Sequence, residues 1–247
     1  MKTTLFRHIL WLAIVLLMAA SCSRYQVVSI SSENMSIAGR DTLFNSMISP
    51  YREQIYAEMN EVIGRVGSDM FKAQPEGELG NWVCDVLLEE SEELFGTPAD
   101  FAVYNYGGLR IDMIAAGPLT QGKLFELLPF ENYVVMCTLD AYSTARLLEK
   151  IASAGGWPVA GIEMVIDSAG QPADVRIQGV PLRRDATYSV VMNDYMANGG
   201  DGMDFMTGQP VETAGVTVRD LVIAHVRKQT AAGQVIGSSL ENRIRIE

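Results

Sequence analysis

The sequence predicts an α+β fold, a single domain in which mixed β-sheet is flanked by helices. Helical periodicity is clear over residues 77–95 and 217–229, with a further helix expected over 141–152. Short apolar segments separated by turn residues fill much of the chain between them. Because helices and strands do not alternate regularly, this pattern favours α+β over a doubly wound parallel sheet.

The first 21 residues have the layout of a secretory signal. Lys2 and Arg7 give a basic start, residues 9–20 are almost unbroken apolar, and small residues precede Cys22. The apolar core is shorter than the about 20 residues that a membrane-spanning helix needs. Small residues followed at once by cysteine resemble a bacterial lipobox, so we expect cleavage after residue 21 and a lipid on Cys22. The alternative is an ordinary signal peptide with a coincidental cysteine.

The chain is acidic, with a formal net charge of -11 that becomes -13 when the two basic leader residues are removed. An acidic surface argues against binding to nucleic-acid polymers or to anionic lipid. We therefore expect an exported protein, attached to the cell envelope by its lipid alone and facing the periplasm. A small anionic ligand is still compatible with this charge, because one or two local arginines can hold it.

After the signal, residues 22–40 read as a polar tether, and residues 41–247 are long enough for one large domain. Residues 41–62 have a partly helical pattern that we expect to break near Pro50. Cys84 and Cys137 stand among apolar residues, which favours two buried thiols, although the export compartment permits a disulfide. The sequence holds no Cys/His cluster with the spacing of a zinc site.

One candidate binding segment is the turn at residues 105–110, which follows an apolar strand over 100–104. Gly107 and Gly108 allow another backbone or a ligand to approach closely. Asn105 offers a donor and an acceptor, and Arg110 offers a charged fork that suits carboxylate or phosphate. Taken alone, such a glycine turn is more often structural than functional.

A second candidate segment is the glycine-rich stretch at residues 195–202. It places the ring of Tyr195 close to the carboxylate of Asp201, which is held on flexible backbone beside Gly200. An aromatic ring stacks on a flat heterocycle, and a carboxylate accepts hydrogen bonds from both hydroxyls of a ribose. The alternative is a hairpin turn with a packed tyrosine.

Four segments in order resemble one known family. They are Gly80-Asn81-Trp82-Val83-Cys84-Asp85, the turn Asn105 to Arg110, Pro129-Phe130-Glu131-Asn132, and Asn198 to Gly202. These segments resemble the "GNxxxD", "NxGGxR", "PFxN" and "GGDG" motifs of the C-terminal domain of the 5′-nucleotidases. In that family an α+β domain of this kind holds the nucleoside part of the substrate. A separate N-terminal metallophosphoesterase domain binds two metal ions and cleaves the phosphate.

The resemblance implies roles for individual residues. Asn105 and Arg110 would bind the base or ribose side of the ligand, Tyr195 would be one ring of an aromatic clamp, and Asp201 would accept the ribose hydroxyls. Trp157 is the nearest candidate for the other ring, although its match needs a shift of one residue. The family also places an arginine shortly before its "GN" motif, where this chain has Lys72 and no arginine.

The resemblance extends to the substrate-binding half of the enzyme alone. His225 is the single histidine after the signal and more closely fits a packed or surface position than a metal ligand. We therefore expect no catalytic residue, metal or other cofactor in this chain, and a separately encoded metallophosphoesterase as partner in nucleotide catabolism. The alternatives are a non-catalytic nucleoside-binding lipoprotein and a domain kept for structural reasons.

The lipid anchor gives a first testable prediction. Cys22→Ser removes the sulfur that carries the lipid, so the variant should leave the membrane fraction and become soluble in the export compartment. Mass spectrometry of the N-terminal peptide should find a lipid on the wild-type chain. Unchanged membrane association, together with an unmodified wild-type peptide, would show that no lipid is attached.

Overall fold

The computed structural model describes residues 42–183 and 185–247. The predicted signal, the tether and Cys22 lie outside these residues. The chain divides into two compact units, Met1–Met47 and Ile48–Glu247. Of the first unit only the beginning of helix α2 is described, and the elements below otherwise belong to the second.

The α-helices are α2 (Thr42–Met59), α3 (Glu78–Glu89), α4 (Ser91–Phe95), α5 (Gln121–Leu127), α6 (Ala141–Ser153), α7 (Asp194–Ala197) and α8 (Val218–Ala231). The strands are β1 (Val62–Val66), β2 (Met70–Phe71), β3 (Phe101–Val103), β4 (Met113–Ile114), β5 (Gly117–Thr120), β6 (Tyr133–Leu139), β7 (Val159–Ala160), β8 (Ile162–Ile166), β9 (Pro172–Ile177), β10 (Val180–Pro181), β11 (Tyr188–Asn193), β12 (Val211–Thr217) and β13 (Ile244–Ile246). Short 3₁₀ turns occupy Tyr106–Gly108, Gly200–Gly202 and Asp204–Met206. None of the helices in the described part of the chain is long and apolar enough to cross a membrane.

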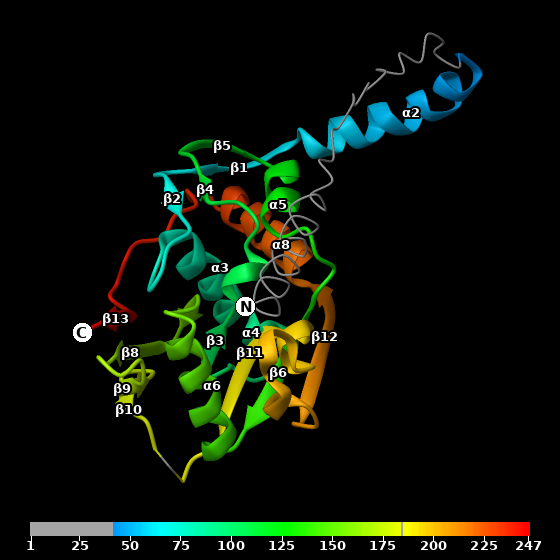
Figure 1. Cartoon of the computed structure of the whole chain (residues 1–247). Coiled ribbons are helices and arrows are strands. Elements are labelled where there is room, and N and C mark those ends of the chain that lie inside the picture. The colour runs from blue at the N-terminus through cyan, green and yellow to red at the C-terminus, as the bar shows by residue number, and fades with distance from the viewer. Residues whose placement is uncertain (1–41, 184) are drawn as a thin grey trace, which may run out of the picture. The chain divides into compact units, whose positions relative to one another are not determined.

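The largest sheet has five strands in the order β12-β6-β11-β3-β7 (Figure 1). Strand β11 runs parallel to β3 and antiparallel to β6. Parallel neighbours end at the same edge of a sheet, and an antiparallel neighbour begins there. The ends of β3 and β11 and the start of β6 therefore meet at one edge, and segments 105–110, 194–202 and 129–132 emerge from it.

Both faces of this sheet are buried at its central strands β11 and β3, whereas the edge strand β12 is largely exposed. On β11, Val191 belongs to a core cluster with residues of α3 and α8, whereas Val190 and Met192 belong to a second cluster with residues of α6. Successive side chains of a strand point to opposite faces, so the two clusters lie on opposite sides of the sheet. A strand covered on both faces is apolar along its whole length, which explains the short apolar runs in the sequence.

Smaller sheets complete the domain. A four-stranded sheet has the order β10-β9-β8-β13, in which the C-terminal strand β13 runs parallel to β8. Two further pairs join β1 to β5 and β2 to β4.

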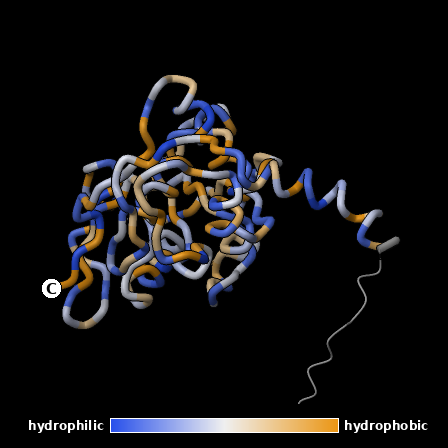
Figure 2. Tube along the Cα trace, turned by 90° about the horizontal axis from the view of Figure 1, so that it is seen from above, coloured by the Kyte–Doolittle hydropathy of each residue, from blue (hydrophilic) through white to orange (hydrophobic). Residues whose placement is uncertain are grey.

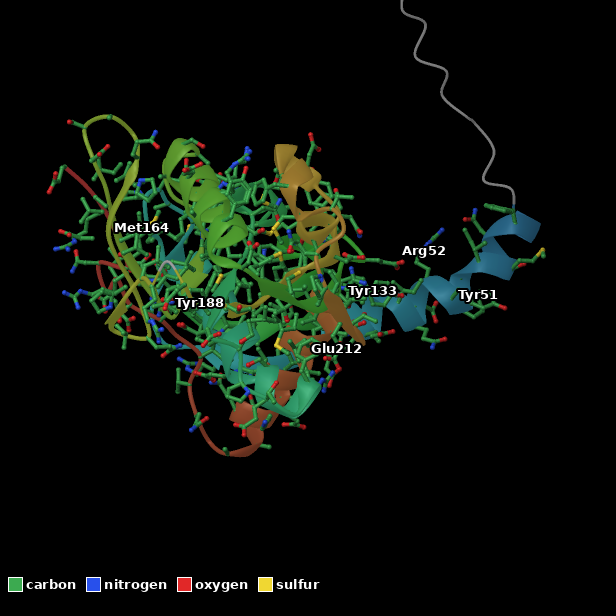
Figure 3. All side chains as sticks on the ribbon, turned by 90° about the horizontal axis from the view of Figure 1, so that it is seen from below. Tyr51, Arg52, Tyr133, Met164, Tyr188 and Glu212 are labelled. Atoms are coloured by element: carbon green, nitrogen blue, oxygen red, sulfur yellow. The ribbon has the colours of Figure 1, made fainter. Side chains whose placement is uncertain are left out.

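The four-stranded sheet and the central sheet share one hydrophobic core. Met164 of β8 and Tyr188 of β11 both belong to the second core cluster, and both are labelled in Figure 3. Hydrophobic and hydrophilic stretches alternate along the chain (Figure 2). The observed α+β fold with mixed sheets and flanking helices confirms the predicted class.

Two predictions about helices need correction. Helix α2 continues through Pro50 instead of breaking there. The φ of proline is helical, although its ring removes one backbone hydrogen bond and crowds the carbonyl of the preceding turn. The single helix expected over 77–95 is two helices, α3 and α4, which meet at Glu90.

The acidic run of this segment is only partly a solvated face. Glu90 is 8 % exposed, and its Oε1 lies 2.6 Å from Nδ1 of buried His225 on α8. Lys228 also contacts Glu90, at 3.2 Å, and contacts Glu93, which is exposed. Although burial acts in the opposite direction, hydrogen bonds from His225 and Lys228 hold the pKa of Glu90 below its ordinary value. His225 thus joins α8 to the junction of α3 and α4.

The two cysteines of the domain are free and buried, as favoured from the sequence. Cys84 belongs to the core cluster of α3 and α8, and Cys137 belongs to the cluster on the other face of the central sheet. Burial raises the pKa of both thiols, and that of Cys137 reaches about 12. Neither thiol is therefore an activated nucleophile.

The C-terminal segment is fixed to the domain by Arg243, which is 7 % exposed. Its guanidinium binds Asp85 of α3 with contacts of 2.8 and 3.0 Å, and it donates to the carbonyl oxygen of Val159 at 2.8 Å. Burial raises the pKa of Asp85, and the hydrogen bond from Arg243 opposes that rise. The ion pair stabilises the attachment of β13 to helix α3.

Loss of this ion pair gives a prediction for stability. Arg243→Met should lower the free energy of unfolding by about 2–4 kcal/mol, because Asp85 and the Val159 carbonyl lose their donor. The matched control is Arg245→Met, two residues further along the chain in β13, where the side chain is exposed and the loss should be under about 0.5 kcal/mol. Urea unfolding of the three proteins measures both values. Equal stability of the two variants would contradict a structural role for Arg243.

Candidate functional site

A cavity of about 350 Å³ opens at the edge of the central sheet where β3 and β11 end and β6 begins. Its walls come from the three segments that emerge there. They are lined by Asn105, Gly107, Gly108, Arg110, Phe130, Asn132, Tyr195 and Asp201. Residues that are far apart in the sequence thus converge because of how the strands pair.

Asn105 follows β3 and is 5 % exposed. Its Nδ2 donates to Oδ2 of Asp201 at 2.8 Å, and its Oδ1 accepts from Nδ2 of Asn193 at 3.0 Å. Both ends of the amide are therefore bound by protein groups. Glycine is required at position 108, because a Cβ there would lie 2.5 Å from the ring of Tyr104. A Cβ at Gly107 would instead meet only Asn105 Nδ2 at 4.0 Å.

Arg110 is the cationic group of the cavity wall. Its Nη1 donates to the Gly107 carbonyl at 3.3 Å, and its Cζ lies 5.7 Å from the centroid of the Phe130 ring. Across the described parts of the chain, no carboxylate forms an ion pair with Arg110. The guanidinium therefore keeps most of its donors for a ligand.

Lys72 lies behind this wall and does not line the cavity. Its Nζ donates to the Leu109 carbonyl at 2.9 Å and lies 4.0 Å from the centroid of the Tyr106 ring. Burial lowers the pKa of Lys72, the charge of Asp112 opposes the change, and the charge of Arg110 adds to it. Lys72 supports the turn at 105–110 through the backbone.

The opposite wall is built on an unusual backbone. Asp201 has a φ of 55°, in the left-handed region, between Gly199 with a φ of 91° and Gly202 with a φ of 76°. Such a conformation in a residue other than glycine costs about 1–3 kcal/mol and is often found at ligand sites. The Tyr195 hydroxyl donates to Asp201 Oδ1 at 3.2 Å and accepts from the Asp201 backbone N–H at 3.1 Å.

Gly200 makes this arrangement sterically feasible. A Cβ on Gly200 would lie 2.5 Å from two ring carbons of Tyr195 and 2.6 Å from its carbonyl oxygen. The ring of Tyr195 therefore packs directly on the backbone of Gly200. Gly200 supports the ring from behind and is not itself part of the cavity lining.

The third wall, residues 129–132, is fixed by helix α8. Arg219 is buried, its Cζ lies 4.3 Å from the centroid of the Phe125 ring, and its Nη1 donates to the carbonyls of Leu128 and Pro129, each at 3.3 Å. The backbone N–H of Val218 donates to the Asn132 carbonyl at 2.9 Å. These bonds hold the loop that carries Phe130.

Two aromatic rings are left partly exposed in this cavity. Phe130 is 48 % exposed and Tyr195 is 44 % exposed, and both line the same space. Large rings are usually buried in a folded domain, so a pair that faces one cavity offers an apolar surface to a flat ligand.

The structure brings together most of the residues expected from the sequence. Those that line the cavity are Asn105, Gly107, Gly108, Arg110, Tyr195 and Asp201. Two expected residues are outside the lining. Gly200 packs behind the ring of Tyr195. Trp157 is 6 % exposed, packs in the second core cluster, and lies under Lys150 Nζ at 5.7 Å from its ring centroid. A ring buried in the core is not available to a ligand, so the assignment of Trp157 to the cavity is corrected.

Phe130 and Asn132 are the cavity residues to which the sequence pattern assigns no role. Both belong to the segment Pro129-Phe130-Glu131-Asn132, which resembles a family motif without indicating what its ring does. An aromatic residue within a motif is the signal that could have identified Phe130.

The cavity is lined by amide, guanidinium, carboxylate and aromatic side chains. Within the described ranges, no group of three or more His, Cys, Asp or Glu side chains is placed to hold a metal ion. His225 lines no part of the cavity and is bound to Glu90. The cavity therefore offers hydrogen-bond donors, acceptors and aromatic surface.

Comparison with known proteins gives a consistent result. The chain is 30 % identical over 180 residues to a 5′-nucleotidase of Vibrio vulnificus, covering 69 % of this chain and 31 % of that protein. It is 27 % identical over 217 residues to cell wall protein Lmo0130 of Listeria monocytogenes, covering 78 % of this chain and 28 % of that protein.

A solved structure agrees with these relatives. The 5′-nucleotidase precursor from Thermus thermophilus matches with a TM-score of 0.70 and 28 % identity, over 84 % of this chain and 43 % of that one. This chain thus spans less than half the length of each of the three proteins.

The family model described as "5′-nucleotidase, C-terminal domain" matches residues 60–208, which include all three walls of the cavity. The match covers more than half of the chain. This chain therefore belongs to the family of 5′-nucleotidase C-terminal domains.

Proposed function

We propose that the cavity binds a nucleoside or nucleotide, with the base between the rings of Phe130 and Tyr195. The observation that carries the proposal is the convergence of two partly exposed rings and one carboxylate on a space of about 350 Å³. Stacking on an aromatic ring contributes about 1–3 kcal/mol per base and tolerates every base, because each has a π-face. Stacking on Phe130 and Tyr195 would therefore contribute to affinity without selecting one base over another.

Asp201 supplies the group that distinguishes a ribose. Its two oxygens each accept one protein hydrogen bond, from Asn105 and from Tyr195. A carboxylate has about four lone-pair positions, so one further acceptor position remains on each oxygen. The two adjacent hydroxyls of a ribose ring can each donate a hydrogen bond to one oxygen of the Asp201 carboxylate. In this proposal the 2′- and 3′-hydroxyls bind to Asp201.

The polar ends of the ligand have partners on the opposite wall. Arg110 has free donors beside Phe130, and Asn132 adds an amide to the same wall. A guanidinium recognises a carbonyl oxygen or a phosphate oxygen through directed N–H bonds. Arg110 thus provides a positive charge in a protein whose formal net charge is -11.

We further propose that the chain supplies substrate recognition to a separate metallophosphoesterase in nucleotide catabolism. The part of the relatives named 5′-nucleotidase that aligns with this chain is 31 % of the Vibrio vulnificus protein and 43 % of the Thermus thermophilus one. The cavity also offers recognition groups without an activated nucleophile beside them. Divalent metals would then belong to the partner.

The proposed location is the periplasmic face of the cell envelope, with Cys22 carrying the lipid. A relative is named a cell wall protein, which is consistent with an exported chain. Anchoring would confine the binding domain to a surface where its partner also acts.

Two substitutions separate stacking from ribose recognition. Tyr195→Ala should weaken binding of every nucleoside by about ten- to a hundredfold and leave the preference for ribose intact. Asp201→Ala should cost a similar factor with ribonucleosides and should remove the preference for ribose over 2′,3′-dideoxyribose, because the acceptor is lost. Isothermal titration calorimetry with adenosine and its dideoxy analogue measures both effects.

Matched controls exist for each change. Tyr142 is 66 % exposed on α6 and does not line the cavity, so Tyr142→Ala should bind as wild type does. Asp204 is exposed in the same loop as Asp201 and is also outside the lining, so Asp204→Ala should behave likewise. If wild-type protein binds no nucleoside at millimolar concentration, with or without a metallophosphoesterase, the recognition proposal is wrong.

If substrate recognition and phosphate cleavage lie on separate chains, phosphate release should depend on both chains being present. The purified chain should release negligible phosphate from adenosine monophosphate with Mn²⁺ or Zn²⁺ present. Added to a metallophosphoesterase encoded beside it, the wild-type chain should raise kcat/KM, and Asp201→Ala should not. A metal-dependent turnover of about 1 s⁻¹ by this chain alone, in the ordinary enzyme range, would contradict the proposal.

A further inference from the structure

Asn193 lies beneath the cavity and does not line it. It is the last residue of β11 and the N-cap of α7, and it is fully buried. Its Oδ1 accepts the backbone N–H of Met196 at 2.8 Å, and its Nδ2 donates to Oδ1 of Asn105 at 3.0 Å. Asn105 in turn donates from Nδ2 to Asp201 Oδ2 at 2.8 Å. Three hydrogen bonds therefore connect a helix terminus to the carboxylate.

These bonds run in one direction, and both ends require it: the N–H of Met196 can only donate, and the carboxylate of Asp201 can only accept. An asparagine amide has a donor end and an acceptor end that differ little in shape, so its orientation depends on its partners. A backbone N–H only donates, so Met196 requires the oxygen of Asn193. The nitrogen of Asn193 then faces Asn105, and the nitrogen of Asn105 must face Asp201.

We propose that Asn193 is a positioning residue for ligand binding, which orients Asn105 so that Asp201 is held toward the ribose. This inference rests on the proposed nucleoside function. It adds a buried residue, remote from the ligand, that determines the sugar preference of the site. Asn193 acts through Asn105 and touches no part of the ligand itself.

The reverse orientation of Asn105 shows why the direction matters. With its oxygen toward Asp201, two acceptors would face each other without a proton between them, and the carboxylate would turn away. The remaining side-chain bond to Asp201 comes from Tyr195, at 3.2 Å and exposed to solvent. The bond from Asn105 is shorter and part-buried, so it is the firmer of the two restraints.

Asn193 also connects the two walls of the cavity. Burial raises the pKa of the Tyr104 phenol, while hydrogen bonds from Asn193 and Asn132 oppose that rise. Tyr104 therefore remains a neutral phenol between Asn193 and Asn132, and Asn132 lines the wall that carries Phe130. Asn193, beneath Asp201, and Asn132, on the wall that carries Phe130, thus both interact with the Tyr104 phenol.

The test replaces the donor of Asn193 and keeps its cap. In Asn193→Ser, the hydroxyl oxygen still accepts from Met196 but is too short to donate to Asn105. In Asn193→Asp, the shape and the cap are kept and the donor is again lost. Each variant of the full chain should bind adenosine about tenfold more weakly than wild type, while its affinity for 2′,3′-dideoxyadenosine changes by less than about twofold.

A control separates this effect from general destabilisation. Thr217 caps α8 by accepting the backbone N–H of Asp220 at 3.1 Å. Thr217→Ala should lower the melting temperature through the loss of a helix cap and should leave the ratio of the two affinities unchanged. An unchanged ratio in both Asn193→Ser and Asn193→Asp would overturn the proposal.

A second readout is independent of any ligand. Hydrogen exchange of the Asn105 side-chain amide, followed by ¹⁵N NMR, should be slow in the wild type and fast in Asn193→Ser. If wild-type protein binds neither nucleoside but this protection is lost in the variant, the nucleoside function fails while the orienting role of Asn193 stands. If both nucleosides bind as predicted and the protection is unchanged in the variant, the orienting role is the part that fails.

Discussion

The pairing of β11 with its two neighbours is the constraint on which the site depends. Because β11 is parallel to β3 and antiparallel to β6, three chain segments from distant parts of the sequence begin or end at one sheet edge. Burial of both faces of the sheet fixes this register, since a shift of one residue would exchange the side chains of the two core clusters. The position of the cavity is therefore a consequence of core packing, and the loops supply its chemistry.

The glycine-rich loop after β11 illustrates how that chemistry is maintained. Asp201 holds a backbone conformation that is unfavourable for it, and Gly199, Gly200 and Gly202 provide the surrounding freedom and close contact. Hydrogen bonds from Asn105 and Tyr195 offset the conformational cost. The backbone conformation and the two hydrogen bonds together hold the carboxylate in one position.

The sequence was sufficient for the fold class and for most of the cavity because both depend on local patterns. Apolar periodicity located α3, α6, α8 and the strands of the central sheet, and the motifs located Asn105, Arg110, Tyr195 and Asp201. Trp157 was misplaced because nothing local to Gly155-Gly156-Trp157 reveals that its ring packs in the core. The role proposed for Asn193 could not be assigned from the sequence, because it depends on hydrogen bonds to residues far away in the chain, whereas the ring of Phe130 stands within a motif that the sequence does show.

The placement of the two thiols has a consequence for the fate of the unfolded chain. Cys84 and Cys137 lie on opposite faces of one sheet, so native packing keeps them apart. Once the domain opens, nothing prevents them from meeting, and an oxidising compartment would join them. The resulting loop would be incompatible with the native sheet between them. In such a compartment, this disulfide would prevent the unfolded chain from refolding. The lifetime of the folded protein would then depend on its unfolding rate and not on its free energy of unfolding.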